Sequence, residues 1–87
     1  MYKLSFDPAK RMRTLTERNV DFKDAKEVFE GRVTEWEDKR FNYGEKRIIC
    51  FGYLRGRAVV IGYVQRGDTR HIFSMRKANE RERERFE

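Results

Sequence analysis

The stretch that decides the fold is residues 46–75, KRIICFGYLRGRAVVIGYVQRGDTRHIFSM, in which apolar and aromatic residues fill three successive segments. Their β-branched and alternating composition predicts strands over 46–54, 57–66 and 69–75. Arg55-Gly56 and Gly67-Asp68 provide the two-residue turns that join antiparallel neighbours. The stretch therefore predicts an antiparallel sheet within an α+β fold.

The residues before this sheet predict two helices. Residues 1–6 are expected to form a short strand. Asp7-Pro8 then favours a helix over 8–18, because aspartate caps a helix and proline suits its first position. Asp21 begins a second helix that ends at Gly31. Its apolar positions follow helical spacing, and they are Phe22, Ala25, Val28 and Phe29.

The remaining segments complete a single domain over 1–87. We expect a strand over 33–36, a polar loop over 38–45 and a terminal helix over 76–87. The whole is predicted to be a short N-terminal strand, two helices, a three- to four-stranded antiparallel sheet and a C-terminal helix.

The turn positions also predict which side chains share a face of the sheet. They pair Phe51 with Val60, Ile49 with Gly62, Gly62 with Phe73, Val64 with His71 and Val60 with Met75. In this register the face expected to lie under the two helices carries Ile49, Phe51, Tyr53, Val60, Val64, Phe73 and Met75. The opposite face carries Lys46, Ile48, Cys50, Ile61, Tyr63, Gln65, Arg70, Ile72, Ser74 and Arg76.

Composition narrows the class of protein. Lys and Arg number 21 against 15 Asp and Glu, so the net charge of +6 predicts a polyanion or an acidic protein as partner. No apolar run is long enough to span a membrane, and residues 1–10 lack the apolar core of a secretory signal. Cys50 and His71 are single residues of their kind, which excludes an intrachain disulfide and a protein-only zinc site. We expect a cytoplasmic protein without metal or cofactor.

Five pieces of sequence carry a resemblance that covers nearly the whole chain. They are residues 6–10 (FDPAK), 17–22 (ERNVDF), 43–47 (YGEKR), Arg66-Gly67 and 72–82 (IFSMRKANERE). In this order and spacing the chain resembles the BrnT toxins of bacterial type II toxin–antitoxin systems. Many BrnT toxins have Lys-His-Gly where this chain has Glu17-Arg18-Asn19, so no role of that histidine is transferred.

The resemblance implies a fold like that of the RelE/ParE toxins and a ribonuclease activity that halts translation. It also implies a BrnA-type antitoxin with a ribbon-helix-helix DNA-binding region. Toxin and antitoxin would form a heterotetramer that represses its own promoter, so that operator DNA is bound only through the antitoxin. No membrane contact is expected.

The residues suggest where RNA would be cleaved. Metal-free cleavage needs a base for the 2′-OH, an acid for the 5′-oxygen and cations for the phosphorane, and arginine suits the last role. The catalytic candidates are Arg70, Arg76, Ser74 and Lys77, and the RNA-binding candidates are Lys46, Tyr63, Arg66 and Tyr43. We expect the basic residues of the last hairpin and its exit to converge in one electropositive hollow.

Several roles stay open at this point. The base is Glu45, Lys46 or Tyr63, with Lys77 as a possible acid, and His71 is a weaker candidate because the predicted register puts it on the apolar face. Arg81, Arg83 and Phe86 are expected to bind the antitoxin. The alternative function is a non-catalytic basic module that acts only within a protein–DNA repressor complex. A direct nucleic-acid binder is disfavoured, because no helix-turn-helix, zinc or RNA-binding motif is present.

Overall fold

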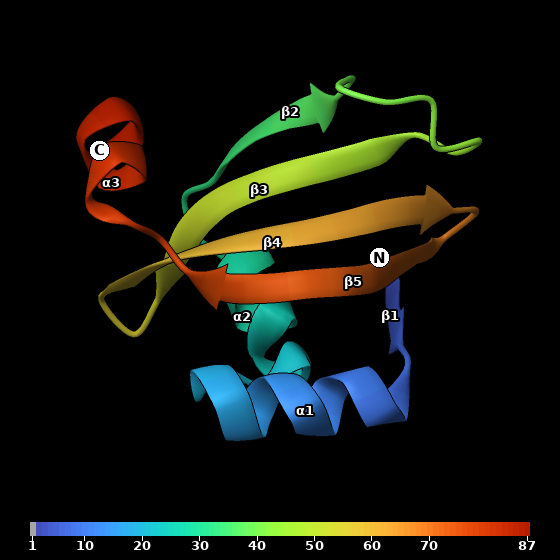
Figure 1. Cartoon of the computed structure of the whole chain (residues 1–87), viewed down its shortest axis with the longest axis horizontal. Coiled ribbons are helices and arrows are strands. Elements are labelled where there is room, and N and C mark those ends of the chain that lie inside the picture. The colour runs from blue at the N-terminus through green and yellow to red at the C-terminus, as the bar shows by residue number, and fades with distance from the viewer. Residues whose placement is uncertain (1) are drawn as a thin grey trace.

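The computed structural model describes residues 2–87 as one mixed sheet with helices on two sides (Figure 1). The strands are β1 (Lys3–Phe6), β2 (Thr34–Asp38), β3 (Arg47–Leu54), β4 (Arg57–Arg66) and β5 (Thr69–Lys77). The helices are α1 (Pro8–Arg18), the 3₁₀ turn η1 (Phe22–Asp24), α2 (Ala25–Glu30) and α3 (Glu80–Phe86). The α+β class predicted from the sequence is therefore confirmed.

The sheet differs from the prediction in strand number and direction. Its order is β1-β5-β4-β3-β2, and β2 to β5 are antiparallel, whereas β1 pairs with β5 in parallel. The expected three- to four-stranded antiparallel sheet is thus wrong, because the N-terminal strand adds a fifth, parallel member. This pairing joins the two ends of the chain, and no local pattern specifies it.

One extra residue in β5 changes the register of the last hairpin. The predicted pairs of Phe51 with Val60 and Val64 with His71 are confirmed. However, Gly62 pairs with Ser74 and Val60 with Arg76, because Phe73 forms a β-bulge. A Cβ on Gly62 would lie 2.5 Å from the Phe73 ring, so glycine makes the space that this ring occupies. The predicted pairs of Gly62 with Phe73 and Val60 with Met75 are wrong for this reason.

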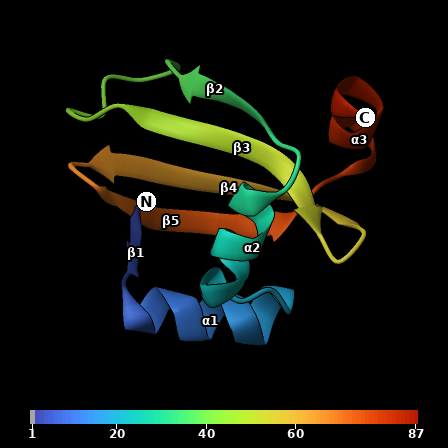
Figure 2. The same cartoon turned by 180° about the vertical axis from the view of Figure 1, so that it is seen from behind.

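The helices lie on the face of the sheet opposite to the predicted one. We call it the helix face, and its buried residues under η1 and α2 are Cys50, Val59, Ile61, Tyr63, Ile72 and Met75. Gly52 permits the close approach of α2, since a Cβ there would meet the Val28 side chain at 2.7 Å. The bulge at Phe73 moves Met75 to this face. Figure 2 shows α2 crossing the sheet on this side.

The other side, which we call the open face, holds a smaller apolar cluster. Phe51, Ala58 and Val60 are buried there against Phe86 and Ala78 at the C-terminal end of the chain. The apolar residues that were predicted to meet the N-terminal helices therefore receive α3 instead. Figure 1 shows α3 near β2 and β3, apart from α1 and α2.

Capping residues explain where the helices begin and end. Asp7 accepts a hydrogen bond from the Ala9 backbone N–H at 2.9 Å, and Asn19 ends α1 in the left-handed conformation. The helix predicted to begin at residue 76 begins at Glu80, because β5 continues to Lys77 and Asn79 caps the helix in a capping box. Within the described part of the chain, no helix combines the length and apolar character needed to cross a membrane.

Candidate active site

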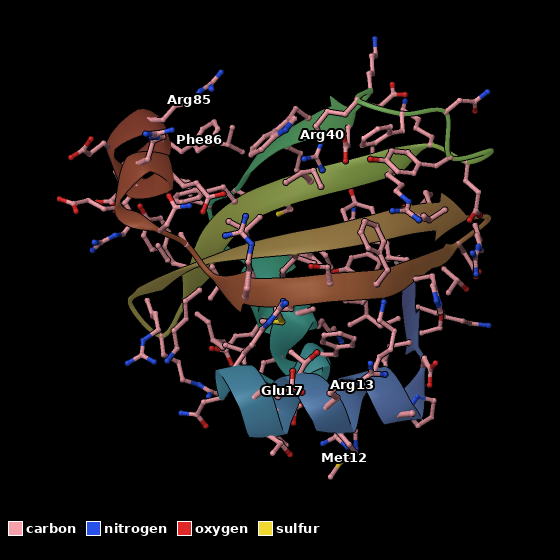
Figure 3. All side chains as sticks on the ribbon, in the orientation of Figure 1. Met12, Arg13, Glu17, Arg40, Arg85 and Phe86 are labelled. Atoms are coloured by element: carbon pink, nitrogen blue, oxygen red, sulfur yellow. The ribbon has the colours of Figure 1, made fainter. Side chains whose placement is uncertain are left out.

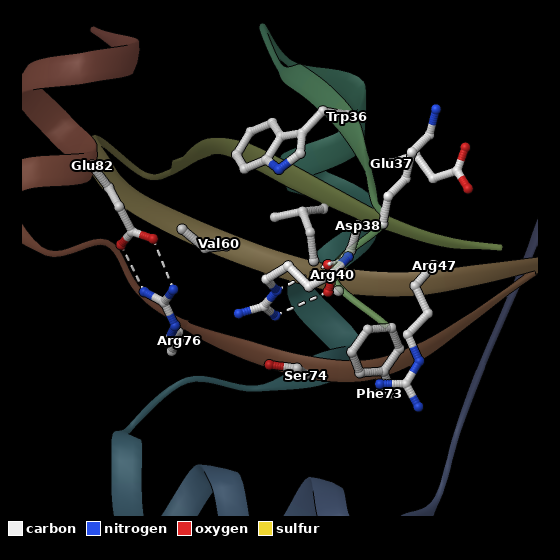
Figure 4. Close-up of a pocket in the computed structure, with 13 residues that line it drawn as sticks. Trp36, Glu37, Asp38, Arg40, Arg47, Val60, Phe73, Ser74, Arg76 and Glu82 are labelled. Carbon is white, nitrogen blue, oxygen red and sulfur yellow. Dashed lines mark hydrogen bonds and ion pairs between the residues drawn. The ribbon is translucent and has the colours of Figure 1, made fainter. Parts of the chain in front are cut away.

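A hollow of about 470 Å³ lies on the open face, between β2, the bulge of β5 and the start of α3 (Figure 4). Its lining combines basic, acidic and aromatic side chains. Four strands, the loop after β2 and α3 line it with Trp36, Glu37, Asp38, Lys39, Arg40, Arg47, Ile49, Val60, Gly62, Phe73, Ser74, Arg76 and Glu82. This hollow brings Arg47 of β3 and Arg76 of β5 together with the Ser74 hydroxyl and the Glu82 carboxylate.

Arg76 is held at one end of the hollow by a carboxylate of α3. Its two terminal nitrogens donate to the Glu82 oxygens at 2.7 and 2.8 Å, in the bidentate geometry that also suits a phosphate. The guanidinium holds the pKa of Glu82 below its usual value, so this group is a carboxylate at neutral pH. Glu82 also accepts from the Asn79 backbone N–H at 2.9 Å, which ties its position to the start of α3.

Arg47 faces the other end of the hollow between two aromatic rings. Its guanidinium carbon lies 4.0 Å from the centre of the Tyr43 ring and 4.6 Å from that of Phe73. Among residues 2–87, no carboxylate forms an ion pair with Arg47. Stacking fixes the plane of the group and leaves its N–H edge free to bind an anion. The bulge that places Phe73 over Gly62 therefore also positions Arg47.

A buried aspartate organises the loop that closes this end. Asp38 accepts from Arg40 Nε and Nη2, each at 2.9 Å, from the Arg40 backbone N–H at 3.2 Å, and from the Tyr43 hydroxyl at 3.0 Å. The Arg40 guanidinium is the main cause that holds the pKa of Asp38 far below its usual range. This carboxylate therefore orients Arg40, which lines the hollow. It also orients Tyr43, whose ring stacks on Arg47 at the border of the hollow.

An aromatic stack attaches α3 to the sheet beside the hollow. The Phe86 ring lies 4.6 Å from the Trp36 ring at an interplanar angle of 16°, and 5.4 Å from the Phe51 ring. α3 has only seven residues and no buried residue of its own, so it depends on such side-chain contacts. The stack keeps Glu82 next to Arg76. Figure 3 shows Phe86 directed from α3 toward the sheet.

Residues 6–82 match the family model for the ribonuclease toxin BrnT of type II toxin–antitoxin systems. The chain belongs to the BrnT family. The resemblance seen in the sequence is confirmed, and the match establishes the class of activity, a ribonuclease toxin, together with a protein antitoxin as partner. No curated protein matches the chain significantly.

Two of the catalytic residues predicted for this BrnT chain line the hollow. They are Ser74 and Arg76, and Figure 4 shows Ser74 between Arg76 and Phe73. Tyr43, predicted to bind RNA, borders the hollow through its contact with Arg47. Lys77 lies elsewhere, in a second hollow with Arg57 and Arg83, at the turn between β3 and β4.

Arg70 lies on the helix face, away from Arg76. Its guanidinium carbon is 4.3, 4.6 and 4.8 Å from the ring centres of Tyr2, Phe29 and Tyr63. Tyr63 is buried, its hydroxyl donates to Glu35, and burial raises its pKa. Neither Arg70 nor Tyr63 therefore reaches the hollow of the open face.

The predicted convergence of the hairpin arginines is wrong. Arg66 donates to both Glu45 oxygens at 3.0 Å, and Lys46 is exposed in the loop before β3. His71 shares a 2.8 Å hydrogen bond with the Ser5 hydroxyl. These groups lie near the end of the sheet where β4 turns into β5, whereas Arg76 pairs with Val60 toward the other end of β5. Of the residues predicted to bind the antitoxin, Arg81 and Arg83 are exposed on α3. Phe86 instead packs against the apolar cluster of the open face.

Sequence reasoning missed Arg40, Arg47 and Glu82. A signal existed for Glu82, because Asn79 with Glu82 three residues later fits a capping box, which fixes where the carboxylate lies. Arg47 is the first residue of β3, and an alternating pattern places it on the same face as Ile49 and Phe51. Assigning that face to the helices removed it from consideration.

Proposed function

We propose that the chain cleaves single-stranded RNA without a metal ion in the hollow of the open face. The observation that carries this proposal is the position of Arg47 and Arg76, from two different strands, on one hollow with the Ser74 hydroxyl. Two guanidinium groups bind the scissile phosphate and stabilise the negative charge that develops on it. The Ser74 hydroxyl donates a hydrogen bond to a phosphate oxygen.

Glu82 is the general base in this proposal. A phosphate that enters the hollow competes for the Arg76 nitrogens that Glu82 now occupies. Once released, the carboxylate accepts the proton of the 2′-OH, and the 2′-oxygen attacks phosphorus as the bond to the 5′-oxygen breaks. The departing 5′-oxygen takes a proton from solvent water, so the products are a 2′,3′-cyclic phosphate and a 5′-hydroxyl. Tyr43 and Phe73 keep Arg47 in place during this exchange.

Family membership supports the remaining proposals, which concern the biological setting. We infer that cleavage of RNA in the cytoplasm inhibits translation and that the fold is of the RelE type. The antitoxin is a BrnA-like ribbon-helix-helix protein that forms a heterotetramer with the toxin, and operator DNA is bound through the antitoxin. Exposed Arg81 and Arg83 on α3 are candidates to contact it, because a partner there would cover the side of the hollow that Glu82 forms.

The test is RNA cleavage by the purified chain with and without EDTA. Cleavage should resist EDTA and should fall at least about 100-fold in Arg47→Ala and Arg76→Ala, because each removes a positioned cation. Arg57→Ala, an exposed arginine near the turn between β3 and β4, is the matched control. All variants must melt cooperatively.

The same assay includes Arg70→Ala, a catalytic candidate from the sequence. Loss of cleavage in a folded Arg70→Ala variant, with full cleavage in Arg76→Ala, would move the site to the helix face. Absence of cleavage by the wild-type chain at any protein level would favour the non-catalytic interaction module instead.

A further inference from the structure

A third hollow, of about 380 Å³, forms a trench between α1 and β5. The side of α1 that lines it carries residues three and four apart, and β5 contributes two residues of the bulge. Its lining is Lys10, Arg13, Thr14, Glu17, Arg18, Phe73 and Ser74. Phe73 and Ser74 also line the candidate active site, so the two hollows lie on either side of these residues of β5. Figure 3 shows Arg13 and Glu17 on the side of α1 toward β5, with Met12 pointing away.

The charge of the trench is positive and largely uncompensated. Three basic residues face one acidic residue, Glu17, which gives a net charge of +2 (three minus one). Among residues 2–87, neither Arg13 nor Arg18 forms an ion pair. By contrast, Arg11 on another side of α1 is paired with Asp21 at 2.8 and 2.9 Å. The free cations of α1 thus lie on the side that meets β5.

The backbone of β5 keeps the trench open and in place. β1 pairs with β5 only as far as Ile72, so β1 does not cover the edge of β5 from Phe73 onward. Lys10 Nζ donates to the Phe73 carbonyl oxygen at 2.8 Å and fixes α1 against this edge. From Lys10 to Arg18 the helix advances about 12 Å, at about 1.5 Å per residue. That length accommodates the backbone of a few nucleotides.

We propose that this trench is a second RNA subsite, in which Arg13 and Arg18 bind phosphates of nucleotides that flank the scissile bond. The proposal rests on the proposed function, because it extends the RNA from the hollow over Ser74 onto α1. Unpaired arginines along a groove that continues the active site are the arrangement by which proteins follow a single strand. RNA is favoured over an acidic protein segment because the trench shares Phe73 and Ser74 with the hollow in which we place the scissile phosphate.

The test measures binding of non-cleavable 2′-O-methyl oligouridylates by fluorescence anisotropy. A dinucleotide reaches only the hollow, whereas an oligomer of about 12 nucleotides reaches the trench as well. The variant Arg13→Ala/Arg18→Ala should lose most of the preference of the wild type for the longer oligomer. Arg32→Ala/Arg57→Ala removes the same charge from exposed positions outside both hollows and should keep that preference.

Salt dependence gives the magnitude. Each phosphate that an arginine neutralises on a single strand adds about −0.7 to the slope of log K against log salt. Removal of both arginines therefore makes the slope about 1.4 shallower. The affinity advantage of the wild type over Arg13→Ala/Arg18→Ala should shrink about sevenfold between about 50 and about 200 mM salt.

Two outcomes overturn the subsite. The first is an equal slope and equal length preference in the trench variant and its control. The second is a trench variant that binds the long oligomer as the control does but no longer binds poly-glutamate, which would assign the trench to an acidic protein segment. Failure of the active site itself is seen separately, as unchanged binding of the dinucleotide by Arg47→Ala and Arg76→Ala.

Discussion

Removal of the Phe86 ring should detach α3 while leaving the sheet folded. Phe86 stacks on Trp36 and packs on Phe51, and the other attachments of α3 are Ala78 and the ion pair between Glu82 and Arg76. A seven-residue helix has no stability of its own in water. The substitution Phe86→Ala therefore acts on the docking of α3.

The magnitude follows from the burial of the ring. Truncation of a fully buried phenylalanine costs about 3–5 kcal/mol, and Phe86 is only partly buried, so about 2 kcal/mol is expected. A change of this size shifts the ratio of docked to detached α3 by about 30-fold. Because the Phe86 ring joins α3 to the sheet and does not hold the strands to one another, the melting temperature of the sheet should change much less than the protection of α3.

Two readouts follow α3 directly. Trp36 is the single tryptophan of the chain, so its emission should shift to the red when the stack is broken. Trypsin cleavage after Arg81 and Arg83 should accelerate by up to about 30-fold under native conditions, because proteolysis follows the population of the open form. RNA cleavage should fall as well, since Glu82 is no longer held at the hollow.

The control is Phe41→Ala, which removes an equal ring that is 70% exposed on the loop after β2. It should change neither readout. Wild-type Trp36 emission in Phe86→Ala, with a trypsin rate within about twofold of the wild type, would show that the Phe86 ring does not hold α3 on the sheet. Trypsin cleavage of α3 only at the temperature where the whole chain melts would show the same.

Three further predictions concern single groups. Glu82→Gln keeps an acceptor for the Asn79 backbone N–H but removes the proposed base. Single-turnover cleavage should therefore slow by about 100-fold or more, with little change in melting temperature. An unchanged cleavage rate would mean that another group accepts the 2′-OH proton. Because the pKa of Asp38 is lowered in the folded chain, its contribution to stability is present above its unfolded-state pKa of about 4 and is lost as the pH falls further. Between pH 7 and 3 the melting temperature of Asp38→Asn should therefore fall less than that of the wild type. An equal fall in both proteins would contradict this prediction. The Cys50 thiol is buried with its pKa raised to about 12, so it should react with a thiol reagent at pH 8 only after unfolding, and rapid reaction of the native chain would count against the packing of the helix face.

Local features of the fold were predictable from the sequence because their causes are local. Asp7, Asn19 and Asp21 cap or end helices through their own backbone neighbours. The turn at Arg55-Gly56 has positive φ at both residues, 50° and 82°, and Gly56 is the one of the two that favours this conformation. Strands β3, β4 and β5 were recognised by composition, as was the apolar side of α2.

The two faces of the sheet could not be assigned by the same means. Both faces are apolar in the middle, so alternation alone does not say which one receives the helices. Two glycines decide it in the structure, since Gly52 admits Val28 of α2 and Gly62 admits the ring of Phe73. The bulge at Phe73 then reverses the parity of the C-terminal half of β5. Both effects depend on contacts between segments that are distant in the sequence.

The wrong assignment of the two sheet faces explains which site residues were predicted and which were missed. Ser74 and Arg76 lie together because they are two residues apart on one strand, beyond the bulge. Arg70 lies before the bulge and on the helix face, so its grouping with Arg76 fails. Arg47 and Glu82 join the hollow through sheet pairing and through the docking of α3. The capping box places Glu82 at the start of α3 but does not specify where α3 docks.

The proposed active site is tested most sharply by a crystal structure of the chain with an RNA oligomer that carries a 2′-deoxy sugar at the cleaved position. We predict a phosphate within about 2.7–3.2 Å of guanidinium nitrogens of both Arg47 and Arg76, with Glu82 turned from Arg76 toward the 2′ position. A phosphate bound beside Arg70 on the helix face, or an intact pair of Arg76 and Glu82 with the RNA elsewhere, would contradict it.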